Sequence, residues 1–212
     1  TTQAICKAFA GDRYIMLLNL IASLSILVPA IVISLALALL IGVIMGMNRG
    51  LRDALHPVLY TISVVPSILL SPFALLLAPN FRTASLFLIV YESVWATVFG
   101  TITGIMTIDR RYLDKAETLE LHGFRKLFRV MLPAASPSII SGFVNSLSGT
   151  FVMLVYAEMY GAQYGLGFYV KRYSTLGIYE NVWGGFLFMV FILIIVMTIF
   201  EKIKNHILRW AM

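Results

Sequence analysis

The chain of 212 residues is 60% hydrophobic and only 12% charged, with a formal net charge of +6 at pH 7. Soluble globular domains have roughly 45–50% apolar and about 25% charged residues, so the composition excludes that class and indicates an integral membrane protein. The single cysteine, Cys6, excludes an internal disulfide framework and a multi-cysteine metal site.

The hydrophobic segments predict the fold class, an all-α polytopic membrane bundle that forms one transmembrane domain over 1–212. A helix needs about 20 mostly apolar residues to cross the hydrocarbon core of a bilayer. Five segments meet this requirement, and they lie at Leu24–Met47, Val58–Ala78, Ala84–Met106, Ser138–Tyr160 and Val182–Phe200. Residues 1–19 mix charged and apolar side chains, which predicts an outer interfacial helix. Because the sequence starts at Thr1 without a methionine, we expect a sixth span in the full chain.

The basic residues predict the orientation, because cytoplasmic loops collect Lys and Arg. When the loops are assigned alternately to two sides, 11 of the 16 basic residues fall on the side of the 107–137 loop and the 201–212 tail. That side is predicted to be cytoplasmic, which leaves the N-terminal helix outside. The same bias accounts for the positive net charge without a nucleic-acid partner.

The 107–137 loop has the pattern of two short helices. Four apolar residues recur at i, i+3, i+4 and i+7, whereas three basic residues occupy another face; they are Phe124, Leu127, Phe128 and Met131, and Arg125, Lys126 and Arg129. Gly123 can end the helix before this one, since glycine adopts the left-handed conformation without steric cost. Leu132-Pro133 is predicted to stop the second helix, and Pro133 and Pro137 to set a rigid entry into the membrane. An amphipathic loop of this kind either docks a partner or binds anionic headgroups.

The loop resembles the EAA loop of ABC-importer permeases of the binding-protein-dependent (MetI-like) superfamily. That pattern is Glu-Ala-Ala, three residues, Gly, nine residues, Ile, one residue, Leu-Pro. Counted back from Leu132-Pro133, it falls on Asp114-Lys115-Ala116, Glu120 and Val130. Lys115 and Glu120 depart from it, so the turn is expected either at Glu120 or at Gly123.

A second match lies downstream. The entry Pro133 to Pro137, then Ala157-Glu158-Met159, then Gly165-Leu166-Gly167 is similar to the nitrate, sulfonate, taurine and bicarbonate branch of that superfamily. The resemblance implies a multi-pass protein of the bacterial inner membrane that is not itself an enzyme.

The resemblance also implies three partners. They are ABC ATP-binding subunits, a second permease subunit in a homo- or heterodimer, and an extracytoplasmic substrate-binding protein. No Gly-x-x-x-x-Gly-Lys-Ser/Thr loop occurs in the chain, so ATP and Mg are expected on the partner ATPase and no cofactor on this chain. The residues expected to form the coupling region are Asp114, Ala116, Glu117, Glu120, His122, Gly123, Phe124, Arg125, Phe128, Leu132 and Pro133.

Polar residues along the spans predict a translocation pathway, with tight helix packing as the alternative. The candidates are Glu92, Ser67, Ser71, Thr97, Ser141, Asn145, Ser148 and Glu158. Glu92 is the one ionisable residue well inside a predicted span, where a carboxylate is costly and marks a functional site by default. A charged Glu92 facing the pathway would disfavour a small anion as substrate. Glu158 is expected either to pair with Lys171 or Arg172 as an outer gate, or to cap its helix.

Two other functions remain open from sequence. The first is an ion- or proton-coupled secondary carrier that uses Glu92 and needs no ATPase. The second is a membrane scaffold that does not transport and whose basic loop recruits a cytoplasmic protein.

Overall fold

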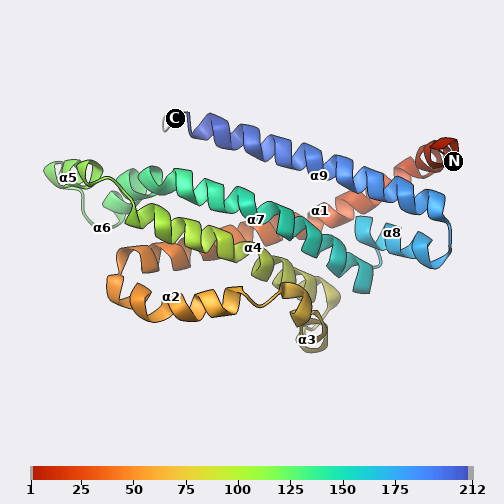
Figure 1. Cartoon of the computed structure of the whole chain (residues 1–212), viewed down its shortest axis with the longest axis horizontal. Helices are drawn as coiled ribbons and strands as arrows, with labels where there is room; N and C mark the ends of the chain where they lie inside the picture. The colour runs from red at the N-terminus through yellow and green to blue at the C-terminus, as the bar shows by residue number, and fades with distance from the viewer. Residues whose placement is uncertain (1, 210–212) are drawn as a thin grey trace. The chain divides into compact units, whose positions relative to one another are not determined.

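A computed structural model describes residues 2–209, and all the regular structure in this part of the chain is helical (Figure 1). The elements in chain order are α1 (Thr2–Met47), α2 (Arg49–Ser63), the 3₁₀ turn η1 (Ser67–Leu70), α3 (Ser71–Leu77), α4 (Phe81–Met106), α5 (Arg110–Thr118), α6 (Gly123–Lys126), the π-helical turn η2 (Leu127–Met131), α7 (Leu132–Gly161), α8 (Leu166–Thr175) and α9 (Tyr179–Ile207). Within the described residues 2–209, four helices are long and apolar enough to cross a membrane, or five if α2 and η1–α3 together form one span. The predicted all-α, multi-pass fold is confirmed.

The chain divides into two compact units, each assembled from three separate stretches. Unit 1 comprises Thr1–Ile33, Pro66–Glu92 and Ser148–Ile199, and unit 2 comprises Ser34–Val65, Ser93–Leu147 and Phe200–Met212. The core of unit 1 contains buried Leu27, Ala30, Leu88, Ile89 and Leu154. One core cluster of unit 2 gathers Ala38, Met45, Val94, Val98 and Ile102, and another gathers Ile105, Ala135 and Ile139.

Helix α1 corrects the prediction of a separate interfacial helix over 1–19. It continues without interruption from Thr2 to Met47, and its apolar, span-like part begins at Phe9. Of the charged residues that suggested a surface helix, Lys7 and Arg13 are exposed, whereas Asp12 accepts hydrogen bonds from two other helices of unit 1. Farther along α1, Asn19 and Ser23 are buried. Asn19 Oδ1 accepts a hydrogen bond from the Gly165 N–H and Ser23 Oγ accepts one from the Leu166 N–H. Their polarity therefore marks a contact with another segment of unit 1 and not an end to the span.

Pro29 lies inside α1, where its missing N–H leaves the Ser25 carbonyl four residues earlier without its helical donor. The Arg82 guanidinium near the start of α4 donates to this carbonyl oxygen over 3.2 Å. A side chain from a second helix thus satisfies the backbone group that the proline releases, as a helix in lipid requires.

The second predicted span, Val58–Ala78, is broken. Helix α2 begins earlier, at Arg49, and ends at Ser63, and a short break separates it from η1 and α3. Pro66 lies in the break with an extended backbone, and Pro72 lies in the first turn of α3, where no intrahelical N–H bond is needed. The prolines that predicted a kink thus lie at an interruption of the span, which we call the elbow.

Helices α4 and α7 pack closely in unit 2 at small residues, as the Gly100/Gly104 spacing predicts. A Cβ added at Gly142 of α7 would lie 2.5 Å from the Ala96 carbonyl oxygen of α4. This partner is a backbone atom and cannot move out of the way as a flexible side chain could.

We therefore expect Gly142→Val to destabilise the protein by about 1–3 kcal/mol or to prevent its folding, because the added methyl groups overpack a backbone contact. Thermal unfolding in detergent, followed by the fraction that stays soluble, measures the effect. Gly11→Val is the matched control, since nothing lies within 4 Å of a Cβ at that position of α1. An equal loss in both variants would contradict the packing argument.

Candidate functional site

The loop between α4 and α7 begins with a well-capped helix. The Asp109 side chain accepts a hydrogen bond from the Arg111 N–H over 2.9 Å at the start of α5. The Arg111 guanidinium also binds this carboxylate, at 2.6 and 3.0 Å, and these hydrogen bonds lower the pKa of Asp109. The cap fixes where α5 begins and hence which residues face outward along it.

The turn that ends α5 lies at Glu120. The Leu121 N–H donates to the Ala116 carbonyl and the Glu120 N–H donates to the Glu117 carbonyl, both over 2.9 Å. This pair of bonds defines a Schellman motif, in which the residue after the helix takes the left-handed conformation. Glu120 has a φ of +52°, and no other non-glycine in the described part of the chain has a positive φ. The turn therefore occupies the position where the EAA pattern has glycine, and Gly123 instead opens α6.

A non-glycine residue in this conformation carries a steric cost of about 1–2 kcal/mol. We therefore expect Glu120→Gly to raise the free energy of unfolding by about 1 kcal/mol, once the greater freedom of glycine in the unfolded chain is subtracted. Gly123→Ala should change stability in the opposite direction, because Gly123 has a φ of +55° and nothing lies near its Cβ position. Thermal unfolding of the two variants tests this pair, and a shift of the same sign in both would show that backbone conformation does not control the turn.

The predicted helix stop at Leu132-Pro133 is wrong, because α7 continues from Leu132 to Gly161. The Leu132 N–H donates to the Leu127 carbonyl five residues earlier, so the wide π turn joins α6 to α7. Pro133 is the second residue of α7 and directly follows this π turn. Pro137 leaves the Pro133 carbonyl without a helical partner, and Ser136 Oγ donates to it over 2.8 Å.

The predicted apolar stripe of the second helix is divided between two faces. Phe124 and Phe128 are exposed, with 79% and 63% of their surface accessible, whereas Leu127 is buried and Met131 packs on the cluster around Ile139. The π turn changes the angular spacing of the side chains, so a 3.6-residue period does not describe this segment.

The remaining coupling candidates of the loop differ in exposure. Asp114, Glu117, His122, Arg125 and Pro133 are exposed, Leu132 is half-buried, and Ala116 is buried beneath α5. Lys126 Nζ reaches the Glu117 carboxylate at 3.2 Å and so ties α6 back to α5.

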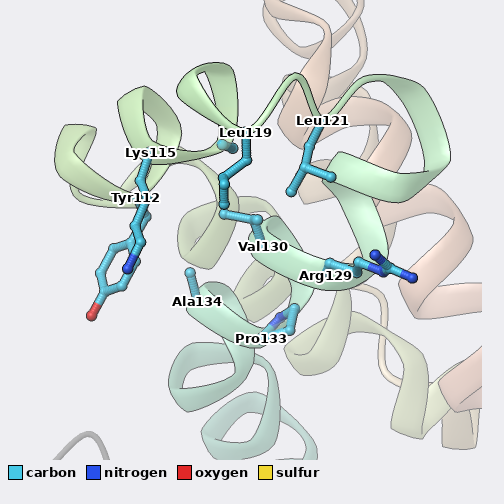
Figure 2. Close-up of a pocket in the computed structure, with 9 residues that line it drawn as sticks. Tyr112, Lys115, Leu119, Leu121, Arg129, Val130, Pro133 and Ala134 are labelled. Carbon is cyan, nitrogen blue, oxygen red and sulfur yellow. The ribbon is translucent and has the colours of Figure 1, made fainter.

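Sequence reasoning did not find a pocket of about 590 Å³ between α5 and the beginning of α7 (Figure 2). Leu119, Leu121 and Val130 point toward one another at its centre, with Pro133 and Ala134 below them. The Lys115 side chain lies beside Tyr112 on one side, and Arg129 extends away on the other. The exposed, apolar Leu119 in the turn is the sequence signal that could have indicated this surface.

Three of the predicted pathway residues form contacts at the elbow of the broken span in unit 1. Ser67 Oγ donates to Glu92 Oε2 at 2.5 Å and also lies 3.3 Å from Met153 Sδ. Ser71 Oγ lies 3.3 Å from the Tyr156 hydroxyl. The Glu92 carboxyl of α4 therefore fixes the residue that starts the second arm of the elbow.

The other pathway candidates on the spans differ in exposure. Thr97 in unit 2 is buried. Ser141 and Asn145, one turn apart on α7 in unit 2, are both exposed, and Ser148 is exposed in unit 1. A polar side chain exposed on a membrane-spanning helix needs a hydrogen-bond partner, and hydrocarbon cannot provide one.

Glu158 does not form the predicted gate, since no ion pair joins it to Lys171 or Arg172 within the described residues. Its side chain is buried at the end of α7, and its Oε2 accepts a hydrogen bond from the Gly167 N–H over 2.8 Å. The N–H groups of residues 165, 166 and 167 are thus bound by Asn19, Ser23 and Glu158 in turn. Glu158 caps the beginning of α8 and not the end of its own helix.

Asp12 forms a second polar network that the sequence did not predict. Its Oδ2 accepts hydrogen bonds from the Tyr169 hydroxyl at 2.8 Å, the Tyr173 hydroxyl at 2.7 Å and Asn181 Nδ2 at 2.7 Å. Burial, with Asp12 adding to it, raises the pKa of Tyr169, and the hydrogen bond to Asp12 raises the pKa of Tyr173. Helices α1, α8 and α9 are joined at this carboxylate.

Comparison with known proteins supports the sequence resemblance. The family described as "Binding-protein-dependent transport system inner membrane component" matches residues 34–211. A putative aliphatic sulfonates transport permease of Bacillus subtilis is 24% identical over 149 residues, which are 70% of this chain and 54% of the relative. A nitrate import permease of Leptolyngbya laminosa is 27% identical over 109 residues, 51% of this chain and 39% of the relative. The chain thus spans about half the length of the curated relatives it matches.

Solved structures share the fold at low sequence identity. The MetNI methionine ABC transporter in an inward-facing conformation contains a chain that matches with a TM-score of 0.75 at 12% identity, over 93% of this chain and 98% of that one. An amino acid ABC transporter matches with a TM-score of 0.68 at 16% identity, over 95% of this chain and 96% of that one.

Proposed function

Because the chain belongs to the family of binding-protein-dependent transport system inner membrane components, we propose that it is the transmembrane subunit of an ATP-driven ABC importer in the bacterial inner membrane. The observation that carries this proposal is the turn at Glu120. The chain keeps the left-handed turn of the EAA loop at the family position even though its residue there is not glycine. The basic-residue count supports a cytoplasmic location for this loop.

The exposed face of the loop is suited to docking an ATPase. Phe124 and Phe128 present a pair of aromatic side chains to solvent beside His122 and Arg125. Exposed aromatic residues with an adjacent arginine are typical of the energetic centre of a protein interface. ATP and Mg are bound by the partner in this proposal, and nucleotide-driven closure of the ATPase moves the loop and the helices attached to it.

The exposed polar side chains of α7 support a second permease subunit. Ser141, Asn145 and Ser148 would be poorly accommodated by lipid tails, whereas a facing subunit or a water-filled pathway offers hydrogen-bond partners. We therefore place the translocation pathway along α7, at the contact with a second copy or a related chain.

The substrate class is inferred from relatives. The Leptolyngbya laminosa and Bacillus subtilis relatives are named for nitrate and for aliphatic sulfonates, which are both small oxyanions. We propose such an anion, delivered by an extracytoplasmic binding protein, as the solute that this chain transports inward.

Reconstituted vesicles test the proposal against a secondary carrier. We expect uptake of a labelled alkanesulfonate to require ATP and the ATPase subunit, and to continue when a protonophore and a sodium ionophore collapse the ion gradients. Glu92→Gln should leave this energy dependence unchanged, because Glu92 hydrogen-bonds Ser67 at the elbow. Uptake driven by an ion gradient without ATP would refute the importer assignment.

A further inference from the structure

A second pocket lies in unit 1, where the end of α7 meets α8, with a volume of about 460 Å³. Its polar lining consists of Lys171, Arg172 and Thr175 on α8. Its other walls are formed mainly by apolar and aromatic side chains, namely Met159, Tyr160, Phe168 and Leu176. Sites for small molecules occupy about 300–1,000 Å³ and combine apolar walls with a few convergent polar groups, so this pocket has the size and composition of a ligand site.

The two cations of this pocket have no counter-ion in the described part of the chain. Lys171 and Arg172 are exposed, and neither is within ion-pair distance of a carboxylate. The two carboxylates that bind α8 or its tyrosines are engaged elsewhere, because Glu158 binds the Gly167 N–H and Asp12 binds two tyrosines and an asparagine. Glu180, at the start of α9, forms no ion pair with either cation. The pocket therefore presents positive charge that the surrounding acidic residues do not neutralise.

Helix α8 holds these cations in a fixed position within unit 1. Three side chains bind the N–H groups at its beginning, and Tyr169 and Tyr173 in its middle bind Asp12. A Cβ at Gly167 would clash with the Val155 carbonyl oxygen, so α8 lies in direct backbone contact with α7. A site built on such a fixed element loses little conformational freedom when a ligand binds.

We propose that this pocket binds a small organic oxyanion, such as an alkanesulfonate or a carboxylate. The ammonium and guanidinium groups donate charge-assisted hydrogen bonds to the anionic head. Thr175 belongs to the same lining, and its hydroxyl donates to the Lys171 carbonyl. The aromatic and aliphatic walls contact the hydrocarbon part, which an inorganic anion does not have. The role of the site in import, as an outer station before the pathway, rests on the proposed function, whereas binding itself does not.

The test is a titration of the full transporter, in nanodiscs of zwitterionic lipid, with 1-butanesulfonate, followed by saturation-transfer NMR. We expect saturable binding that weakens at least about tenfold in the Lys171→Gln/Arg172→Gln double variant, since two hydrogen bonds to charged groups are lost. Lys7→Gln/Arg13→Gln is the matched control, because it removes two exposed cations of α1 in the same unit. 1-Butanol, which has the chain without the charge, should not bind.

Each outcome of this titration supports or overturns the proposed oxyanion site. Equal binding in the wild type and the Lys171/Arg172 variant overturns the proposal, as does an equal loss in the α1 control. Nitrate competing as strongly as 1-butanesulfonate overturns the organic class. No binding of 1-butanesulfonate, together with capture of an acidic partner protein that depends on Lys171 and Arg172, makes the surface a protein contact instead. If 1-butanesulfonate does not bind while ATP-driven uptake persists, the importer assignment stands and the binding site is refuted. If it binds but no ATP-driven uptake is found, the site exists but has no role in import.

Discussion

Replacing Phe124 and Phe128 together with alanine is expected to separate the chain from its ATPase and to abolish ATP-driven transport. Both rings are more than 60% exposed although they are large and apolar. Truncation of a buried aromatic anchor at an interface costs about 2 kcal/mol or more, which is about 30-fold in affinity, and two neighbouring anchors should cost more than one. Because neither ring supports the core of unit 2, the variant should still fold.

Co-purification of the ATPase and uptake into vesicles measure this effect side by side. The matched control is Phe73→Ala/Phe87→Ala, which removes two phenylalanines of α3 and α4 that are 62% and 52% exposed and lie outside the loop. Thermal unfolding should be unchanged in the Phe124/Phe128 variant. Full transport and ATPase binding in that variant would show that the loop docks through another surface.

Asp12→Ala is expected to lower the free energy of unfolding more than Asp12→Asn or Asp53→Ala does. It leaves two phenol hydroxyls and one amide without their acceptor, and each hydrogen bond to a charged group contributes about 1.5–3 kcal/mol. We expect a loss of about 3 kcal/mol or more, because the three bonds share one oxygen and are not additive. Asp12→Asn should lose less, since its amide oxygen can still accept.

Thermal unfolding of these variants should be compared with that of Asp53→Ala. The exposed Asp53 carboxylate pairs with Arg49 at 3.7 Å and with Arg52 at 3.9 Å, and a surface ion pair contributes about 0–1 kcal/mol. The pH dependence gives a second readout. Tyr169 and Tyr173 have folded pKa values raised above their ordinary 10.0, so their contribution is fully present below pH 10 and is lost as the pH rises through the raised values. Equal stability of Asp12→Ala and Asp53→Ala would contradict the network.

The sequence predicted the fold class and most span positions because apolar length is a local property. Helix α4 begins three residues before its predicted start and ends at the predicted Met106, and α9 contains the whole of Val182–Phe200. The errors arose at residues whose hydrogen-bond partners lie far away in the sequence. Charged residues within 1–19 suggested a surface helix because the hydrogen bonds of Asp12 with residues 169, 173 and 181 cannot be read from the order of the chain.

In the loop between α4 and α7, too, the features set by nearby residues were predicted better than those set by backbone conformation. The spacing to Leu132-Pro133 indicated the register of the loop. Gly123 was expected to end the first helix because glycine adopts the left-handed conformation without steric cost, but the turn lies at Glu120, where residue type gives no sign of a positive φ. Proline at 133 suggested a stop because the π turn that precedes it has no recognised sequence signature. Glu158 was chosen as a site residue, yet its partner proved to be a backbone amide and not a cation.

Hydrogen bonds from other helices hold the N–H groups at the beginning of α8, and this makes these groups useful for measuring motion. The amide hydrogens of residues 165–167 are each held by a side chain from α1 or α7, so they can exchange with solvent only when those contacts open. Three adjacent amides therefore act as a built-in reporter, readable by deuterium uptake of a single peptide. A nucleotide that loosens this part of unit 1 would make that peptide exchange faster, and one that leaves it intact would not.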